Sequence, residues 1–313
     1  MADFPRHPTE GPDRLRASVA VARAATRLAT AGIGPARAEA EQLAAYVLGV
    51  SRGRLALVDG FGAAQLHRFE ELVARRARRE PLQHLLGSAA FRQLELAVGP
   101  GVFVPRPETE LLAGWAIEAA RAATPDPAAG GRPSGSGVTV VDLCSGSGAI
   151  ALAVADELPT ATVLAVERSP AALAWLRRNA AERAGAGDRP IEVRAGDVTD
   201  PGLLTELSGR VDVLVCNPPY VPVGTEVGPE VADDPAEAVF GGADGLAVIR
   251  PLVDRAARLL RPGGMLGVEH DDTQGETVPA LLAADGRFDR IVGHEDLTGR
   301  PRFVTARRVA GPS

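Results

Sequence analysis

The chain contains no lysine, and all 34 of its basic residues are arginine. Together with abundant Ala, Gly and Pro, this indicates GC-rich coding and carries no functional information. Only two cysteines occur among 313 residues, which excludes a disulfide framework. No segment approaches the ~20 uninterrupted apolar residues of a membrane-spanning helix, and the N-terminus has no apolar signal-peptide core. We therefore expect a cytoplasmic protein that does not bind membranes.

Histidine and cysteine form no recognisable metal-binding or nucleophilic pattern. The five histidines show no spacing with acids or cysteines that is typical of a metal site. Cys144 and Cys216 fall at the ends of predicted strands, where a small apolar side chain fits. Neither has a histidine close in sequence to act as its base. We predict no metal centre and no cysteine nucleophile.

The charged residues are distributed unevenly along the chain. Residues 1–105 carry 14 arginines against 10 acidic residues, whereas residues 106–313 carry 20 arginines against 30 acidic residues. A protein that binds a nucleic-acid backbone must neutralise its phosphates. The acidic second part therefore disfavours a nucleic-acid substrate, although a local basic groove stays open as an alternative.

Length and periodicity predict two domains. Residues 1–12 are rich in proline and charge and are expected to be disordered. Residues 13–85 carry three helical stripes and predict a small helical bundle. Residues 86–105 alternate apolar and polar side chains, which predicts a β-hairpin that joins the bundle to a second domain over 106–313. The stripes are Ala17, Val21, Ala24 and Leu28; Ala40, Leu43, Ala44 and Val47; and Leu66, Phe69, Leu72 and Val73.

Four arginines between Arg75 and Arg79 close the last helix of the predicted bundle. The favoured interpretation is a solvated helix end whose charge suits the helix dipole. Contact with an acidic or RNA-bearing partner is the alternative.

Strands and helices alternate in the second domain, which predicts an α/β fold with a seven-stranded, Rossmann-like sheet. Ligands of such sheets bind beyond the carboxyl ends of the strands. The Pro/Gly-rich run Thr124–Gly137 is expected to be a flexible connection, and the excursion over 221–246 is expected to be irregular and to cover the site. The predicted strands are 138–143, 162–166, 191–194, 211–216, 264–269, 288–292 and 303–308.

Asn217-Pro218-Pro219-Tyr220 follows directly after the predicted strand 211–216. Neither proline can continue a sheet, because each lacks an N–H group and has a fixed φ. The resulting turn gathers the Asn217 amide, backbone carbonyls and the Tyr220 ring. These groups suit a planar –NH2 group, since the oxygens accept its two N–H bonds and the ring stacks on its face. A proline-rich turn that merely ends a strand is the alternative.

A glycine turn links the first strand of this domain to a helix expected to begin near Ala149. Gly146 and Gly148 can adopt backbone angles that a Cβ would forbid, and they let the backbone pass close to a ligand. Their G-x-G-x-x-A spacing also matches the dinucleotide fingerprint, so NAD is an alternative ligand. Asp142 would repel a pyrophosphate, whereas it suits a cationic ligand that carries an ammonium group. We therefore favour S-adenosylmethionine (AdoMet) as the cofactor.

Two further acidic residues follow the next two predicted strands. Glu167 lies 19 residues after Gly148 and is placed to accept both ribose hydroxyls. Asp197 follows the strand 191–194 and is placed to meet the adenine end of the same ligand.

These motifs resemble a known family. Asp142-Leu-Cys-Ser-Gly-Ser-Gly148 with Asn217-Pro-Pro-Tyr220 is similar to the class I AdoMet-dependent methyltransferases of planar amino or amide nitrogens. Cys144-Ser145 stands where Gly-Thr is more frequent, and Glu167 where Asp is more usual. From about residue 20 to 308 the chain resembles the HemK-type protein-(glutamine-N5) methyltransferases, through Pro81-Leu-Gln-His-Leu-Leu-Gly87, Val104-Pro-Arg-Pro-Glu-Thr-Glu110, the stretch 234–246 and Asp296-Leu-Thr-Gly-Arg-Pro-Arg-Phe-Val304.

The resemblance implies methylation of the glutamine side chain (N5) in the Gly-Gly-Gln loop of class 1 peptide chain release factors. It implies that Asn217, Pro218 and Tyr220 are catalytic and that Pro219 and Arg106 also bind the substrate. We further expect a monomer whose N-terminal bundle recognises the substrate. The cofactor site implied in this way comprises Asp142, Cys144, Gly146, Gly148, Glu167, Asp197 and Asn217.

Three other functions remain open at this point. Glutamine methylation of a ribosomal protein needs the same chemistry. Asn-Pro-Pro-Tyr also suits the flipped adenine of an N6-adenine DNA or RNA methyltransferase. A non-catalytic AdoMet-sensing or RNA-binding module is the third alternative.

Overall fold

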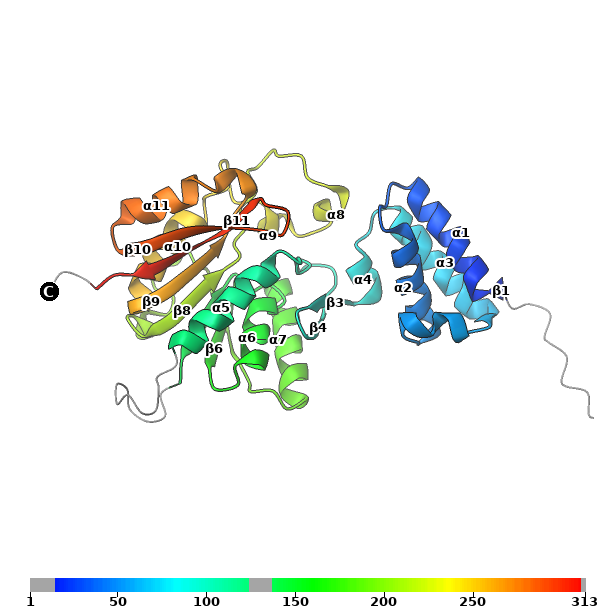
Figure 1. Cartoon of the computed structure of the whole chain (residues 1–313), viewed down its shortest axis with the longest axis horizontal. Helices are drawn as coiled ribbons and strands as arrows, with labels where there is room; N and C mark the ends of the chain where they lie inside the picture. The colour runs from blue at the N-terminus through cyan, green and yellow to red at the C-terminus, as the bar shows by residue number, and fades with distance from the viewer. Residues whose placement is uncertain (1–14, 124–136, 311–313) are drawn as a thin grey trace, which may run out of the picture. The chain divides into compact units, whose positions relative to one another are not determined.

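The computed structural model describes residues 15–123 and 137–310. The tail expected over 1–12, and all but Gly137 of the expected connection Thr124–Gly137, lie outside these residues. Contacts divide the chain between Leu86 and Gly87 into two compact units. Figure 1 shows a helical unit at the N-terminal end and an α/β unit built from the rest of the chain.

The first unit is a small helical bundle, as the sequence predicts. Apolar stripes on the first three helices face one another and bury a core that includes Leu28, Leu43 and Leu72. The left-handed Gly49 (φ +65°) ends the second helix, as glycine commonly does at this position. The elements are α1 (Ala17–Thr30), α2 (Ala36–Leu48), the 3₁₀ helix η1 (Arg52–Leu57), α3 (Ala63–Ala77), α4 (Leu82–Leu86), and the paired strands β1 (Leu15–Arg16) and β2 (Gly60–Phe61).

The arginines at the end of α3 are engaged within the unit. Arg76 is buried, and its Nε lies 2.6 Å from Oε2 of Glu39 on α2. Arg75 pairs with Glu80, and Arg79 donates to the Gly32 carbonyl over 2.8 Å. These contacts join the helices and oppose the alternative that the cluster forms a free basic patch.

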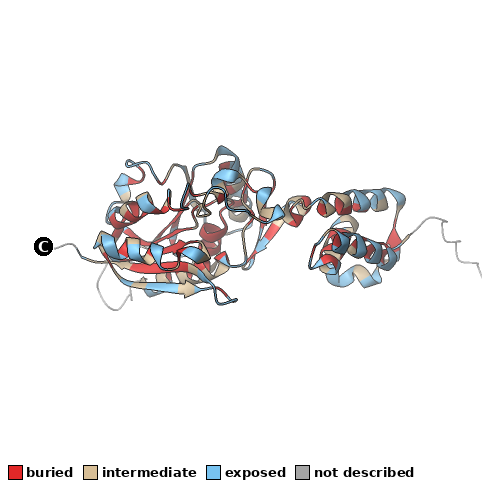
Figure 2. Cartoon of the chain, turned by 90° about the horizontal axis from the view of Figure 1, so that it is seen from above, coloured by how far each residue is buried: buried red, intermediate tan, exposed pale blue. Residues whose placement is uncertain are grey.

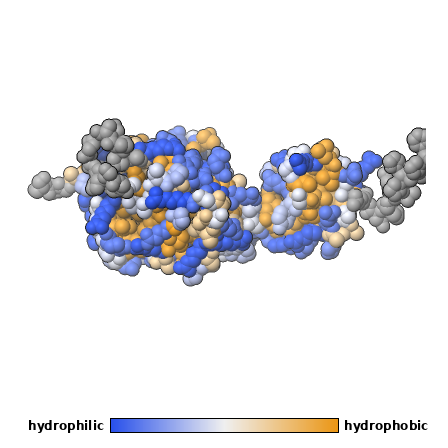
Figure 3. All heavy atoms as spheres, turned by 90° about the horizontal axis from the view of Figure 1, so that it is seen from below, coloured by the Kyte–Doolittle hydropathy of each residue, from blue (hydrophilic) through white to orange (hydrophobic). Residues whose placement is uncertain are grey.

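The surface of the helical unit exposes several large apolar side chains. Leu57 is 82% exposed and Tyr46 49% exposed, and Val19 on α1 is also exposed. Figure 3 shows apolar residues gathered in a band on one face of this unit, beside hydrophilic ones.

The second unit contains the predicted seven-stranded sheet, in the order β10-β11-β9-β8-β5-β6-β7. Strands β5 to β9 run parallel, and β11 pairs antiparallel with both β9 and β10. The strands are β5 (Thr139–Leu143), β6 (Thr162–Glu167), β7 (Glu192–Ala195), β8 (Val211–Cys216), β9 (Leu260–Glu269), β10 (Phe288–Glu295) and β11 (Pro301–Arg308).

Helices cover both faces of this sheet (Figures 1 and 2), so its central strands are buried on both sides. Val140 and Val213 pack into one core with α5 (Thr109–Ala123), α6 (Ala149–Glu157) and α7 (Pro170–Gly185). Their neighbours Val141 and Leu214 pack into another with α10 (Ile249–Leu259) and α11 (Thr277–Asp285). All six side chains of β8 are buried for this reason, and the strand reads as a continuous apolar run with one acid.

That acid, Asp212, fixes the register between β5 and β8. Its carboxylate accepts from the Thr139 backbone N–H over 2.8 Å and from Arg261 Nε over 2.6 Å. The ladder then runs in register from Val140, opposite Val213, to Leu143, opposite Cys216. The two residues that follow this last pair, Cys144 and Asn217, therefore leave neighbouring strands at the same level.

A short hairpin precedes the sheet and belongs to the second unit. Strands β3 (Ser88–Phe91) and β4 (Leu94–Ala97) pair antiparallel, within the predicted range 86–105. The sequence predicts an irregular excursion over 221–246, and this prediction is wrong in part. The segment contains the one-turn helices α8 (Pro229–Ala232) and α9 (Ala236–Val239). Helices of four residues are too short to produce an apolar period in the sequence.

Candidate active site

A cavity of about 570 Å³ opens at the carboxyl ends of the parallel strands. This volume is typical of pockets that bind small molecules. Residues following β5, β6, β7 and β8 line it, as expected for an open α/β sheet. The predicted site residues that line it are Arg106, Asp142, Cys144, Gly146, Glu167, Asp197, Asn217, Pro218, Pro219 and Tyr220.

Asp142 is a buried carboxylate, and only one of its two oxygens accepts a hydrogen bond from the described residues. Its Oδ2 accepts from the backbone N–H of Ala151, on α6, over 3.2 Å. Its Oδ1 is buried and has no hydrogen-bond partner among the described residues. Burial raises the pKa of Asp142 to about 7, against the effect of its hydrogen bond from the Ala151 N–H. An unpartnered carboxylate oxygen beside a cavity suits a cationic ligand.

The glycine loop after β5 is fixed by its serine. Ser145 Oγ donates to the Asp142 carbonyl over 2.8 Å and accepts from the Val166 N–H over 3.1 Å. Gly146 has a φ of +56°, and a Cβ added there would meet nothing within 4 Å. The loop therefore leaves space for a ligand to pass close to the Gly146 backbone.

Gly148 has a different role from the cofactor contact that the sequence predicts. It does not line the cavity. It precedes α6 with a φ of +91°, and a Cβ there would lie 2.5 Å from Cδ1 of Leu176. Glycine is needed here because of the backbone angle and because α7 packs closely against the loop.

Glu167 is held rigidly at the end of β6. Its Oε2 accepts from the Gly146 N–H over 2.8 Å and its Oε1 from the Ser169 N–H over 2.7 Å. Burial raises the pKa of Glu167, and these backbone bonds offset part of that effect. Each oxygen retains a lone pair, so the carboxylate can still accept hydroxyl groups from the cavity. Asp197 is less constrained and bonds mainly to Thr199.

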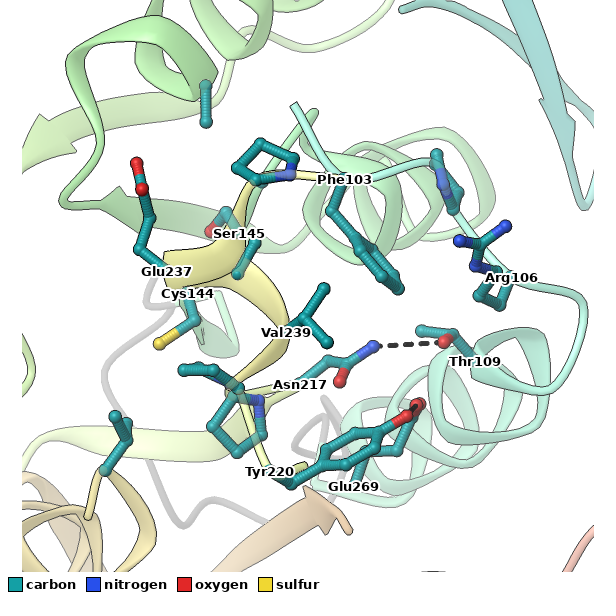
Figure 4. A pocket seen from close by; sticks show the side chains of 18 of the residues that line it. Phe103, Arg106, Thr109, Cys144, Ser145, Asn217, Tyr220, Glu237, Val239 and Glu269 are labelled. Carbon is teal, nitrogen blue, oxygen red and sulfur yellow. Dashed lines mark hydrogen bonds between the residues drawn. The ribbon is translucent and has the colours of Figure 1, made fainter. Parts of the chain in front are cut away.

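The acceptor side of the cavity is built around Asn217. Its Nδ2 donates to Oγ1 of Thr109 over 3.1 Å, and the Tyr220 hydroxyl donates to Oε1 of Glu269 over 3.1 Å. Figure 4 shows the Phe103 and Tyr220 rings at the same opening as the Asn217 amide. Phe103, Thr109 and Glu269 line the same cavity, although the predictions from the sequence do not include them as site residues.

The excursion over 221–246 contributes a wall of this cavity. Val231, Pro235 and Val239 line it, together with the Arg106 loop. Asp234 joins the two segments, because its buried carboxylate pairs with Arg106 and accepts from the Val104 N–H over 3.2 Å. Arg106 also lies over the Phe103 ring, 4.9 Å from its centroid.

The left-handed conformation of Cys144 gives a testable prediction. Its φ is +59°, a conformation that costs a residue with a side chain about 1–2 kcal/mol. We expect Cys144→Gly to raise the free energy of unfolding by about 1 kcal/mol, because glycine removes this strain. Urea denaturation measures the change. Cys144→Ala retains a Cβ and should not be stabilised, so an equal gain in both variants would contradict the explanation.

Within residues 15–123 and 137–310, no group of three or more His, Cys, Asp or Glu side chains could hold a metal ion. No helix within those ranges is long and apolar enough to cross a membrane.

The sheet order, the glycine loop after β5, the acid ending β6 and Asn-Pro-Pro-Tyr after β8 define a class I methyltransferase. Residues 20–87 match the family model "PrmC N-terminal domain", and residues 133–234 match "Methyltransferase small domain". The release factor glutamine methyltransferase of Mycolicibacterium smegmatis is 53% identical over 298 residues, covering 95% of this chain and 99% of that protein. The chain belongs to the release factor glutamine methyltransferase family.

One further sequence relative and one solved structure are also similar to this chain. A 4-amino-L-phenylalanine/4-methylamino-L-phenylalanine methyltransferase of Streptomyces pristinaespiralis is 41% identical over 274 residues, covering 86% of this chain and 88% of that protein. The catalytic domain of hMettl16, solved with an RNA hairpin, aligns with a TM-score of 0.52 at 13% identity. The alignment covers 78% of this chain and 83% of the hMettl16 chain. The second likeness shows the fold alone.

Proposed function

We propose that the protein transfers a methyl group from AdoMet to the side-chain amide nitrogen (N5) of glutamine in the Gly-Gly-Gln motif of class 1 peptide chain release factors. The observation that carries the proposal is Asn217 at the end of β8, whose amide N–H is bound by Thr109. Kinship at 53% identity over 95% of the chain supports the choice of acceptor.

The cavity fits the proposed cofactor. The unpartnered Asp142 Oδ1 offers an acceptor to the ammonium group, and the open space beside Gly146 admits the ligand. Glu167 would hold the ribose hydroxyls, and Asp197 the adenine end, while Cys144 borders the same loop. When bound, AdoMet supplies an electrophilic methyl group on a sulfonium sulfur.

The acceptor residues address the low nucleophilicity of an amide nitrogen. Asn217 Oδ1 and the Pro218 carbonyl would accept its two N–H bonds and hold the nitrogen toward the methyl group. Tyr220 would stack on the amide plane, with Pro219 and Arg106 bordering the acceptor. Such positioning can lower a barrier by several kcal/mol, up to roughly 7–11 in the best intramolecular cases. The nitrogen gains the methyl group and releases one proton to water.

The two units would have different roles in methyl transfer. The methyltransferase domain over 106–313 holds the proposed chemistry, while the hairpin region over 86–105 connects it to the bundle. The bundle over 13–85 would recognise the release factor, and its exposed Leu57 and Tyr46 suit a protein partner better than a nucleic acid. We further propose that the enzyme acts as a monomer and has no nucleic-acid substrate.

Methyl transfer from labelled AdoMet tests the proposal. Purified release factor, ribosomal proteins, adenine-containing DNA and RNA, and 4-amino-L-phenylalanine are offered separately. We expect label on the release factor alone, which mass spectrometry locates to the glutamine of its Gly-Gly-Gln motif. Label only on another acceptor would overturn the assigned substrate and leave the fold and cofactor unaffected.

A further inference from the structure

Gln274 is a buried amide side chain that does not line the cavity, and the chemistry above gives it no role. Its residue is 5% exposed, and it ends the short 3₁₀ helix η3 (Asp272–Gln274), which follows β9. Its Oε1 accepts from the Asp271 backbone N–H over 3.1 Å. Its Nε2 donates to the Tyr220 carbonyl over 3.1 Å and to the Asp244 carbonyl over 3.3 Å. One amide therefore joins three segments of the chain.

These partners permit a single orientation of the Gln274 amide. A backbone N–H group can only donate a hydrogen bond, and a backbone carbonyl can only accept one. Oε1 must therefore face Asp271, while the –NH2 group faces the two carbonyls. Gln274 thus acts as a double donor that bridges Tyr220 and Asp244.

The two bridged carbonyls belong to the acceptor turn and to the end of the excursion that follows it. Tyr220 closes the Asn-Pro-Pro-Tyr turn. The excursion then returns to the next residue, because Val221 donates to the Val239 carbonyl over 3.0 Å and accepts from the Gly241 N–H over 2.9 Å. Val239 lines the cavity, and Figure 4 shows it at the same opening as the Tyr220 ring. Gln274 therefore holds the place where the turn meets this wall.

Gly245 allows the two segments to approach closely at this junction. Its φ is +74°, and a Cβ there would overlap the Tyr220 carbonyl oxygen and lie 2.5 Å from Nε2 of Gln274. Any side chain at this position would therefore push apart the two carbonyls that Gln274 joins.

We propose that Gln274 is a positioning residue for methyl transfer. It fixes the acceptor turn against the end of the excursion, and so it sets where the Tyr220 ring and Val239 hold the acceptor amide. The proposal rests on the function proposed above, in which the acceptor nitrogen binds beside Asn217 and Tyr220. It gives Gln274 no contact with AdoMet, so effects on the acceptor and on the cofactor should separate.

Substitutions on both sides of the junction test the proposal. Gln274→Met keeps the length of the side chain and removes the amide, whereas Gly245→Ala adds the Cβ that separates the segments. We expect each to lower kcat between about ten- and a hundredfold, since a displacement of about 1 Å in an active site can have an effect of this scale. The AdoMet dissociation constant should stay within about twofold of the wild type. The double variant should lose no more than the larger single loss, because both changes open one junction.

The position of Tyr220 can be observed directly. The chain has two tyrosines, Tyr46 and Tyr220, so labelling with 3-fluorotyrosine gives two fluorine resonances, which Tyr220→Phe assigns. In Gln274→Met and in Gly245→Ala the Tyr220 resonance should shift, while the Tyr46 resonance should not. A merely structural role would lower the melting temperature and leave the Tyr220 resonance of the folded protein unchanged.

Arg308→Met is the matched control, because it also removes hydrogen bonds to backbone carbonyls. Arg308 donates to the carbonyls of Ala257, Arg287 and Val309 over 2.7, 3.4 and 2.6 Å, and it does not line the cavity. We expect this variant to have a lower melting temperature but the wild-type kcat and the wild-type Tyr220 resonance. All kcat values are measured below the lowest melting temperature of the set.

The proposal is overturned if Gln274→Met retains the wild-type kcat or the wild-type Tyr220 resonance. It is also overturned if AdoMet affinity and turnover fall by equal factors, or if the losses of Gln274→Met and Gly245→Ala multiply. Should Gln274→Met fail to fold, the same readouts on Gly245→Ala decide. Failure of the proposed function looks different, because the wild-type protein itself would then not methylate the release factor.

Discussion

Alanine in place of Asn217 is expected to lower kcat by about a thousandfold or more, since it removes the acceptor oxygen and the alignment that this oxygen provides. The AdoMet dissociation constant should change by less than about threefold, because Asp142 and Glu167 remain in place. Single-turnover methylation of the release factor measures the first quantity, and isothermal calorimetry measures the second.

The size of this loss follows from the place of Asn217 in the site. Its amide follows the end of a buried strand, and Thr109 binds the amide nitrogen, so the side chain is held in place at the cavity. A variant that lost AdoMet affinity and turnover by equal factors would show that Asn217 mainly holds the cofactor. That outcome would contradict its proposed role toward the acceptor.

Asp142→Asn should have opposite effects on binding and on stability. We expect AdoMet affinity to fall about 100-fold, because a buried charge pair with the ammonium group is lost. The ligand-free variant should have a higher free energy of unfolding at pH 8, since burying the ionised Asp142 is costly when its Oδ1 has no partner among the residues that the structure describes. Calorimetry measures the AdoMet affinity, and urea denaturation without ligand measures the stability. A variant with both weaker binding and lower stability would contradict this account.

The pH dependence follows from the same carboxyl group. Its folded-state pKa of about 7 lies above the ordinary value of 3.8, so the ligand-free protein loses stability as the pH rises from 3.8 to about 7, and the full cost is present above pH 7. AdoMet requires the ionised form, and its affinity should therefore weaken about tenfold between pH 8 and pH 6. Asp142→Asn should remove most of this dependence.

The sequence was sufficient to predict those parts of the site that follow strands. Val211–Cys216 is apolar over nearly its whole length, and its end at Asn217 is marked by two prolines. Gly146 was predicted from the backbone freedom of glycine, and its left-handed φ confirms that need. Gly148 shows that a glycine motif does not by itself predict a ligand contact. Its positive φ and the absence of a Cβ allow α7 to pack closely against the loop.

The contacts between distant segments could not be predicted in this way. Thr109 and Asn217 are 108 residues apart, and Asp234 meets Arg106 across 128 residues. No local pattern records these pairs, since they depend on where helices and loops pack against the sheet. Glu269 had a usable signal, because it ends a strand just as Glu167 does, and the same rule applied to β9 would have selected it.

The register between β5 and β8 has a consequence for how such a chain can change over time. Asp212 fixes the N-terminal ends of β5 and β8 relative to each other, and the Leu143–Cys216 pair lies at their C-terminal ends. The number of residues in each strand between these two points is therefore set. One residue inserted into β8 would turn Asn217 to the opposite face of the sheet while every motif letter stayed intact. Insertions and deletions in functional relatives should therefore fall in the connections and spare these two strands. The length of a buried strand is in this sense as much a determinant of methyl transfer as the identity of any side chain.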